Sequence, residues 1–166
     1  MPTSGTLILR EAYQPLAYGV ETVDLDFNLD PQATVVTSRL KCVRNPDAAA
    51  GPVVLFGEAL ELVSIAIDGA APAEGQVRKT ESGLEVDVDA DEVVLTIVTR
   101  INPSANLTLS GLYQSRGGFY TQCEAEGFRR ITYFPDRPDV MARYTVRLEA
   151  DAATCPVLLS NGNLLE

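Results

Sequence analysis

The chain has 166 residues, enough for one domain with a core, and its 46% hydrophobic and 22% charged residues exclude a disordered polypeptide. Its formal net charge of −10 at pH 7 opposes phosphate backbones and anionic lipid surfaces, so we expect neither nucleic acid nor a membrane as a partner. It contains no histidine, which removes the usual partner of a catalytic nucleophile and a common zinc ligand.

Two features predict the cellular location. The first residues have neither the basic opening nor the apolar run of a secretory signal, and no apolar stretch approaches membrane-spanning length. The three cysteines, Cys42, Cys123 and Cys155, are odd in number and widely spaced, which favours reduced thiols. We therefore expect a cytoplasmic protein, and the cysteine pattern leaves a mature secreted form open.

The first predicted elements are two strands that form a hairpin. Residues 23–29 alternate apolar side chains with acids and an amide, a period of two that predicts a strand with one exposed face. After a turn at Asp30 and Pro31, residues 34–43 are rich in β-branched residues and alternate again. The side chains expected on the buried face of this second strand are Val36, Leu40 and Cys42. The short turn predicts antiparallel pairing.

Further strand-like segments follow, separated by breaks rich in glycine, proline, aspartate and alanine. Their ranges are 53–56, 60–68, 83–88, 93–101 and 144–150. The expected core residues are Ile65, Ile67, Leu95 and Ile97, and the acids expected to face water are Glu61, Asp87 and Asp89. Helix signals are scarce, and residues 136–142 are compatible with a single helical turn. The pattern predicts an all-β sandwich or saddle.

The best clue to function is the segment of residues 121–128, Thr-Gln-Cys-Glu-Ala-Glu-Gly-Phe. If residues 121–126 are extended, Gln122, Glu124 and Glu126 share one face, and Cys123 lies on the other. A partly desolvated carboxylate accepts strong hydrogen bonds from a cation, so this face is a candidate site for an ammonium group. An ordinary solvated strand face is the alternative.

Other chemistries fit less well. Glycosidases need carboxylates on opposite sides of the scissile bond, whereas these glutamates point the same way. Cys123 has no histidine partner and is expected to be a small buried hydrophobe rather than a nucleophile. The cysteine spacing does not fit zinc, and no acidic loop of the calcium-binding type appears. The glycines and aromatic residues of 111–128 are interpreted as turns with aromatic packing. Salt-bridge roles are expected for Arg129, Arg130, Arg137 and Arg143.

Four motifs, taken in order and spacing, resemble bacterial aminopeptidase N, a family of zinc metallopeptidases of the gluzincin class. They are Gly-Leu-Tyr-Gln-Ser at 111–115, the segment of residues 121–128, Asp-Arg-Pro-Asp at 136–139, and Leu-Leu-Ser-Asn-Gly-Asn at 158–163. The resemblance begins near Tyr13, so it covers nearly the whole chain. Its sharpest part lies between Gly111 and Asn163.

The resemblance implies a fold and a domain organisation. Residues 1–166 are expected to form the amino-terminal domain of a larger aminopeptidase, a saddle-like antiparallel β-sandwich with little helix that packs on a thermolysin-like catalytic domain. The family's zinc motif, His-Glu-x-x-His, and its exopeptidase motif, Gly-x-Met-Glu-Asn, do not occur here. We therefore expect no catalytic residue and no metal site in this chain, with zinc in the parent enzyme. The domain is expected to be truncated at its C-terminal edge, with Leu165 and Glu166 derived from a tag.

The resemblance also implies roles for two residues. Glu124 matches the family's acceptor for the free α-ammonium group of a peptide substrate, and Gln122 matches a residue that shapes the pocket for the first side chain. The peptide's free amino terminus is thus the expected ligand. A non-catalytic β-sandwich interaction module is the alternative function. A catalytically silent relative, whose downstream domain lacks zinc ligands, is a third.

Overall fold

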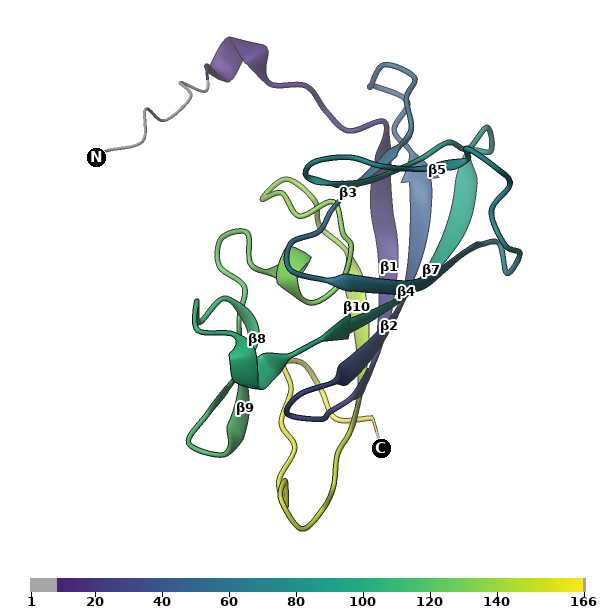
Figure 1. Ribbon diagram of the computed structural model, residues 1–166. Helices are drawn as coiled ribbons and strands as arrows, with labels where there is room; N and C mark the ends of the chain where they lie inside the picture. The colour runs from purple at the N-terminus through teal and green to yellow at the C-terminus, as the bar shows by residue number, and fades with distance from the viewer. Residues whose placement is uncertain (1–8, 166) are drawn as a thin grey trace.

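Figure 1 shows the computed structural model of the chain, which describes residues 9–165. Within this range the chain forms ten strands and three 3-10 helices of three residues each. The strands are β1 (Tyr18–Asn28), β2 (Thr34–Arg44), β3 (Val53–Phe56), β4 (Glu61–Ile67), β5 (Val77–Lys79), β6 (Gly83–Val86), β7 (Glu92–Ile101), β8 (Gly111–Ser115), β9 (Gly118–Gln122) and β10 (Arg143–Glu149). The short helices are η1 (Arg10–Ala12), η2 (Pro103–Ala105) and η3 (Phe128–Arg130). The predicted all-β fold with little helix is confirmed.

The strands form three sheets. A five-stranded sheet has the order β10-β1-β2-β7-β4, a three-stranded sheet has the order β3-β6-β5, and β8 and β9 form a hairpin. The predicted hairpin is confirmed as the antiparallel pair β1 and β2. The expectation of a wholly antiparallel fold is wrong for one pairing, because β10 runs parallel to β1. A tight turn forces antiparallel neighbours, whereas β10 reaches β1 after the long connection from β7, which leaves its direction free.

The alternating pattern places one face of the large sheet in the core. Val36, Leu40 and Cys42 are fully buried, as predicted, and so are Leu95 and Ile97. The other two expected core residues, Ile65 and Ile67, are only half-buried because β4 is an edge strand. The three acids expected to face water, Glu61, Asp87 and Asp89, are all exposed.

The first strand begins at Tyr18, five residues before the predicted start. The register of β1 against β2 shifts between Val20 and Thr22, so the alternation is broken at Glu21 and the sequence pattern hides this part of the strand. The Tyr18 ring is buried, and its hydroxyl donates to the Ala90 carbonyl oxygen at 2.8 Å. The irregular first half of β1 is therefore held by side-chain contacts that periodicity does not reveal.

Residues 131–136 are buried although they form no strand or helix. Their polar groups are satisfied by both neighbouring sheets: the Ser38 and Thr132 hydroxyls lie 2.8 Å apart, and the Thr99 hydroxyl donates to the Ile131 carbonyl oxygen at 2.9 Å. The backbones of Phe56 and Phe134 exchange hydrogen bonds of 2.8 and 3.1 Å. This segment therefore ties the large sheet to the three-stranded sheet.

The single helical turn considered for residues 136–142 does not form. The chain makes a turn at Pro138 and Asp139, closed by a 3.1 Å hydrogen bond from the Val140 N–H to the Arg137 carbonyl oxygen. Asp136 is buried and accepts hydrogen bonds from Arg129, so its carboxylate is engaged with η3 and does not cap a helix. Within residues 9–165, no helix has the length and apolar character that a membrane span requires.

Candidate functional site

The β8–β9 hairpin carries the first candidate residue. Its strands pair from Gly111 opposite Gln122 to Ser115 opposite Gly118, and Figure 1 shows the hairpin to the left of the five-stranded sheet. The segment was predicted to form turns with aromatic packing, and the structure instead forms two paired strands around a turn. The Tyr113 and Tyr120 rings do pack, with centroids 5.9 Å apart. Gln122 is the last residue of β9, and its side chain is exposed.

The chain turns sharply after Gln122, so residues 121–126 are not all extended, and the condition for a shared polar face is not met. Residues 124–127 form a turn in which the Gly127 N–H donates to the Cys123 carbonyl oxygen at 2.8 Å. A Cβ atom at Gly127 would lie 2.6 Å from the Gln122 carbonyl oxygen, so only glycine fits this close approach. Gln122, Glu124 and Glu126 therefore do not share a strand face. The Glu124–Ala125 peptide bond is cis.

The two glutamates of the turn differ in their partners. Glu126 forms an ion pair with Arg129, whose Nη2 lies 3.1 Å from Glu126 Oε2. Glu124 is exposed, and neither its side chain nor that of Gln122 makes a hydrogen bond or ion pair with another residue between positions 9 and 165. Of the three polar side chains predicted to act together, Gln122 and Glu124 are thus available to a ligand, and Glu126 is engaged within the fold.

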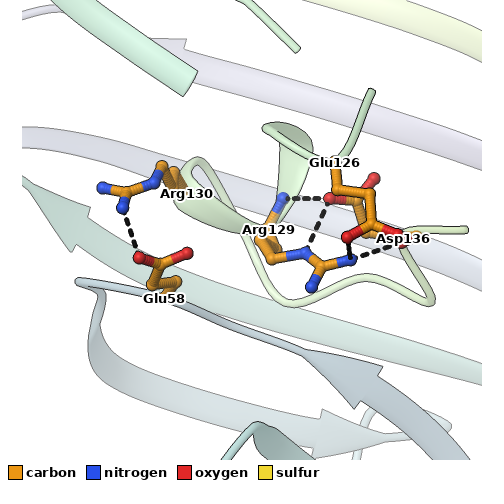
Figure 2. Close-up of polar contacts among 5 residues, drawn as sticks. All are labelled: Glu58, Glu126, Arg129, Arg130 and Asp136. Atoms are coloured by element: carbon orange, nitrogen blue, oxygen red, sulfur yellow. Dashed lines mark hydrogen bonds and ion pairs between the residues drawn. The ribbon is translucent and has the colours of Figure 1, made fainter. Parts of the chain in front are cut away.

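Beneath the turn, Arg129 contacts two carboxylates, as Figure 2 shows. Its Nε and its backbone N–H both donate to Asp136 Oδ2 at 3.0 Å, and its Nη2 donates to the Asp136 carbonyl oxygen at 2.7 Å. Its guanidinium also lies over the Phe56 ring, 4.8 Å from the centroid. The neighbouring Arg130 forms an ion pair with Glu58.

The salt-bridge roles expected for four arginines are confirmed. Arg129 and Arg130 have the partners just described, Arg137 pairs with Asp139 at 2.7 Å, and Arg143 pairs with Glu21 at 3.3 Å. Sequence reasoning did not identify Asp136 as the partner of Arg129. The two are seven residues apart across an irregular segment, and no periodic pattern joins them.

Cys123 adjoins the turn and behaves as a hydrophobic residue, as predicted. Its side chain is half-buried and packs against the core, and burial raises the pKa of its thiol to about 11. The thiol is therefore protonated at neutral pH and is a poor nucleophile. All three cysteines are unpaired in the structure.

The residues present do not fit a zinc ion. The chain has no histidine, and within residues 9–165 no three cysteine, aspartate or glutamate side chains are gathered in a way that could hold a metal. The exposed Glu124 carboxylate can accept hydrogen bonds from a ligand, and the exposed Gln122 amide can both donate and accept them. A carboxylate of this kind suits recognition of a cation.

The amino-acid sequence of the chain is similar to those of bacterial aminopeptidases N. The chain is 52% identical over 151 residues to aminopeptidase N of Caulobacter vibrioides, covering 91% of this chain and 17% of that protein. It is 44% identical over 154 residues to aminopeptidase N of Escherichia coli, covering 93% of this chain and 17% of that protein. The chain thus spans about a sixth of the length of these curated relatives.

Solved structures share the fold. The crystal structure of Legionella pneumophila aminopeptidase A in complex with aspartic acid matches with a TM-score of 0.85 and 32% identity, covering 94% of this chain and 19% of that one. An M1 zinc metallopeptidase from Deinococcus radiodurans matches with a TM-score of 0.69 at 17% identity, covering 84% of this chain and 34% of that one, a likeness of fold alone. Residues 15–166 match the family described as the Peptidase M1 N-terminal domain, and the chain belongs to that family.

Proposed function

We propose that this chain is the amino-terminal domain of a larger zinc-dependent aminopeptidase and that it anchors the free amino terminus of peptide substrates. Glu124 is the proposed acceptor for the α-ammonium group, and Gln122 helps to shape the pocket for the first side chain. The observation that carries the proposal is the exposed Glu124 carboxylate, which has no partner among residues 9–165 while the neighbouring Glu126 is paired with Arg129.

The proposed role of Glu124 is positional. A carboxylate that accepts hydrogen bonds from an ammonium group contributes about 1.5–3 kcal/mol per bond. Because this contact fixes the distance from the amino terminus to the reacting centre, only the first peptide bond is presented for cleavage. A peptide that lacks the free amine leaves the carboxylate desolvated without a partner, so it is discriminated against.

Zinc belongs to the remainder of the parent protein in this proposal, because the chain has no histidine and residues 9–165 gather no set of acidic or cysteine side chains that could hold a metal. When bound there, the metal supplies a Lewis acid and an activated water. This chain holds the substrate and provides no group that takes part in bond cleavage.

The proposal includes a partner and a location. Leu107, Leu109 and Tyr120 lie on or just before the β8–β9 hairpin, and their side chains are exposed. Exposed apolar side chains on and next to this hairpin suit a surface that the rest of the parent protein covers. The three unpaired cysteines support a reducing, cytoplasmic environment.

A protein-interaction module without contact to substrate is the alternative function. The observation that favours it is the same exposed apolar surface, which would suit a separate partner protein as well as a covalently joined domain. The two proposals differ in what Glu124 does, so a substitution at this position distinguishes them.

The test is Glu124→Ala in the full-length protein that contains this chain. We expect kcat/KM for an aminoacyl anilide to fall roughly 10- to 100-fold, the loss of one or two charge-assisted hydrogen bonds, with zinc content unchanged. Glu74→Ala removes an equally exposed carboxylate from the loop between β4 and β5 and should leave kcat/KM unaltered. Equal kcat/KM for the Glu124→Ala variant and the wild type would overturn the proposal.

The coding sequence beyond Asn163 distinguishes an active parent from a silent one. We expect a His-Glu-x-x-His motif followed by a distant glutamate. If the motif lacks one of its histidines, the parent is a catalytically silent relative, and the proposal of an aminopeptidase fails.

A further inference from the structure

Among the arginine ion pairs of residues 9–165, the pair of Arg129 and Asp136 has the least exposed carboxylate. The Arg129 and Asp136 side chains are 19% and 10% exposed. Arg147, which likewise lies between two carboxylates, those of Asp26 and Glu149, is 62% exposed, and its partner Asp26 is 46% exposed. Exposed ion pairs contribute little to folding stability. Removing one partner of a pair that is shielded from water is costly, because the other charge then stays buried without a partner.

The shielded pair connects the turn of residues 124–127 to the body of the domain. On one side, Arg129 Nη2 contacts Glu126 within the turn at 3.1 Å. On the other side, Arg129 contacts Asp136, the last residue of the buried segment 131–136. That segment is bonded to the large sheet through Thr132 and to the three-stranded sheet through Phe134. Arg129 thus joins the turn to both sheets.

The backbone around Arg129 is held as well. The Glu58 N–H donates to the Arg129 carbonyl oxygen at 2.9 Å, and the side chains of Glu58 and Arg130 form an ion pair. On the hairpin side, Gly111 has a φ of +76°, and a Cβ atom there would lie 2.6 Å from the Cβ of Arg130. The end of the hairpin, the turn and η3 are therefore packed closely together. These contacts hold the backbone of the turn that carries the exposed Glu124.

We propose that Arg129 and Asp136 are positioning residues, which hold the turn so that the Glu124 carboxylate meets the substrate's amino terminus. This inference rests on the proposed function. Neither residue touches the substrate. Arg129 is required because its planar guanidinium contacts Glu126 and Asp136 at once, an arrangement that the single ammonium group of lysine does not reproduce.

A double-mutant cycle in the full-length protein tests the inference. We expect Arg129→Lys to lower kcat/KM for an aminoacyl anilide about tenfold, since small misplacements of a positioning group are costly. If Arg129 acts through Glu124, then adding Arg129→Lys to the Glu124→Ala variant should lower kcat/KM no further. A purely structural role would instead give effects that multiply.

Arg147→Lys is the matched control: it makes the same change at the exposed arginine on β10 and should leave kcat/KM unaltered. Asp136→Asn keeps the shape of the partner and removes its charge, and it should show the same lack of further effect in the Glu124→Ala background. Multiplicative effects in both cycles overturn the inference while the proposed function stands. If Glu124→Ala leaves kcat/KM unchanged, the proposed function itself is overturned.

Amide hydrogen exchange on this 166-residue chain gives a readout that does not depend on activity. The Gly127 N–H closes the turn, so its exchange rate reports local opening. We expect Arg129→Lys to speed this exchange at least tenfold, with the amides of β7 unchanged. Unchanged protection at Gly127 would show that the ion pair does not hold the turn and would overturn the inference.

Discussion

Gly127 fixes the path of the chain between the end of β9 and η3. Its backbone comes so close to Gln122 and Cys123 that a Cβ atom would lie 2.6 Å from the Gln122 carbonyl oxygen and 2.8 Å from the Cys123 Cα. Both obstacles are backbone atoms, so the turn must shift if a side chain is added. The position of Glu124 therefore depends on a residue that takes no part in binding.

Gly127→Ala should destabilise the domain by about 1–3 kcal/mol, the usual cost of forcing extra volume into a packed site. Gly19→Ala is the matched control, because a Cβ atom at Gly19 meets nothing within 4 Å. Its effect should stay below about 1 kcal/mol. Urea unfolding followed by circular dichroism measures both. Equal stability of the two variants would show that the turn tolerates a side chain.

At the residue scale, sequence reasoning identified Gln122 and Glu124 from the local motif and from resemblance, and their role stays a proposal. The alternation of polar and small residues continues through Glu126, so it was compatible with an extended segment, although the strand ends at Gln122. It identified Arg129 as an ion-pair residue without finding its partner. Asp136 follows a buried segment without periodicity, so only the folded chain brings the two together.

The strand β7 is an inner strand of the large sheet, next to the edge strand β4. It pairs with β2 on one side and with β4 on the other, and Leu95 and Ile97 on its inner face are fully buried. Its continuous apolar alternation made it predictable from the sequence within one residue. By contrast, β5, β8 and β9 are short and lie next to glycines, so composition favoured turns there. Side-chain packing and cross-strand pairing, rather than local pattern, make them strands.

Leu95→Ala should lower the free energy of unfolding by about 2–5 kcal/mol, because it leaves a cavity in the core. Val63→Ala, on the edge strand β4, removes an exposed side chain and should cost less than about 1 kcal/mol. Chemical denaturation of this chain provides both values. A small effect of Leu95→Ala would contradict the placement of the Leu95 side chain in the core.

At the scale of the whole molecule, the proposed function divides one site between domains. The chain matches 17% of the length of the two aminopeptidase N relatives described above and has no histidine, and among residues 9–165 the Glu124 carboxylate has no partner. In the proposal, this chain binds the substrate's amino terminus and the remainder of the parent protein cleaves the peptide bond.

The isolated chain should release no chromophore from an aminoacyl anilide, with or without added zinc. The physical reason is that the chain has no histidine, that residues 9–165 gather no metal-binding set of side chains, and that burial raises the pKa of the Cys123 thiol to about 11. The assay needs the full-length protein as a positive control. Zinc-dependent turnover by the purified chain would refute the division of labour between domains.

The central claim, that Glu124 recognises the α-ammonium group, is tested most directly by inhibition of the full-length protein. The measurement is the ratio of inhibition constants for an amino acid amide and for the same amide lacking the α-amine, in the wild type and in Glu124→Ala. We predict a strong preference for the amine in the wild type and a ratio near one in the variant, because the carboxylate that distinguishes the two is gone. An unchanged ratio in Glu124→Ala would contradict the claim.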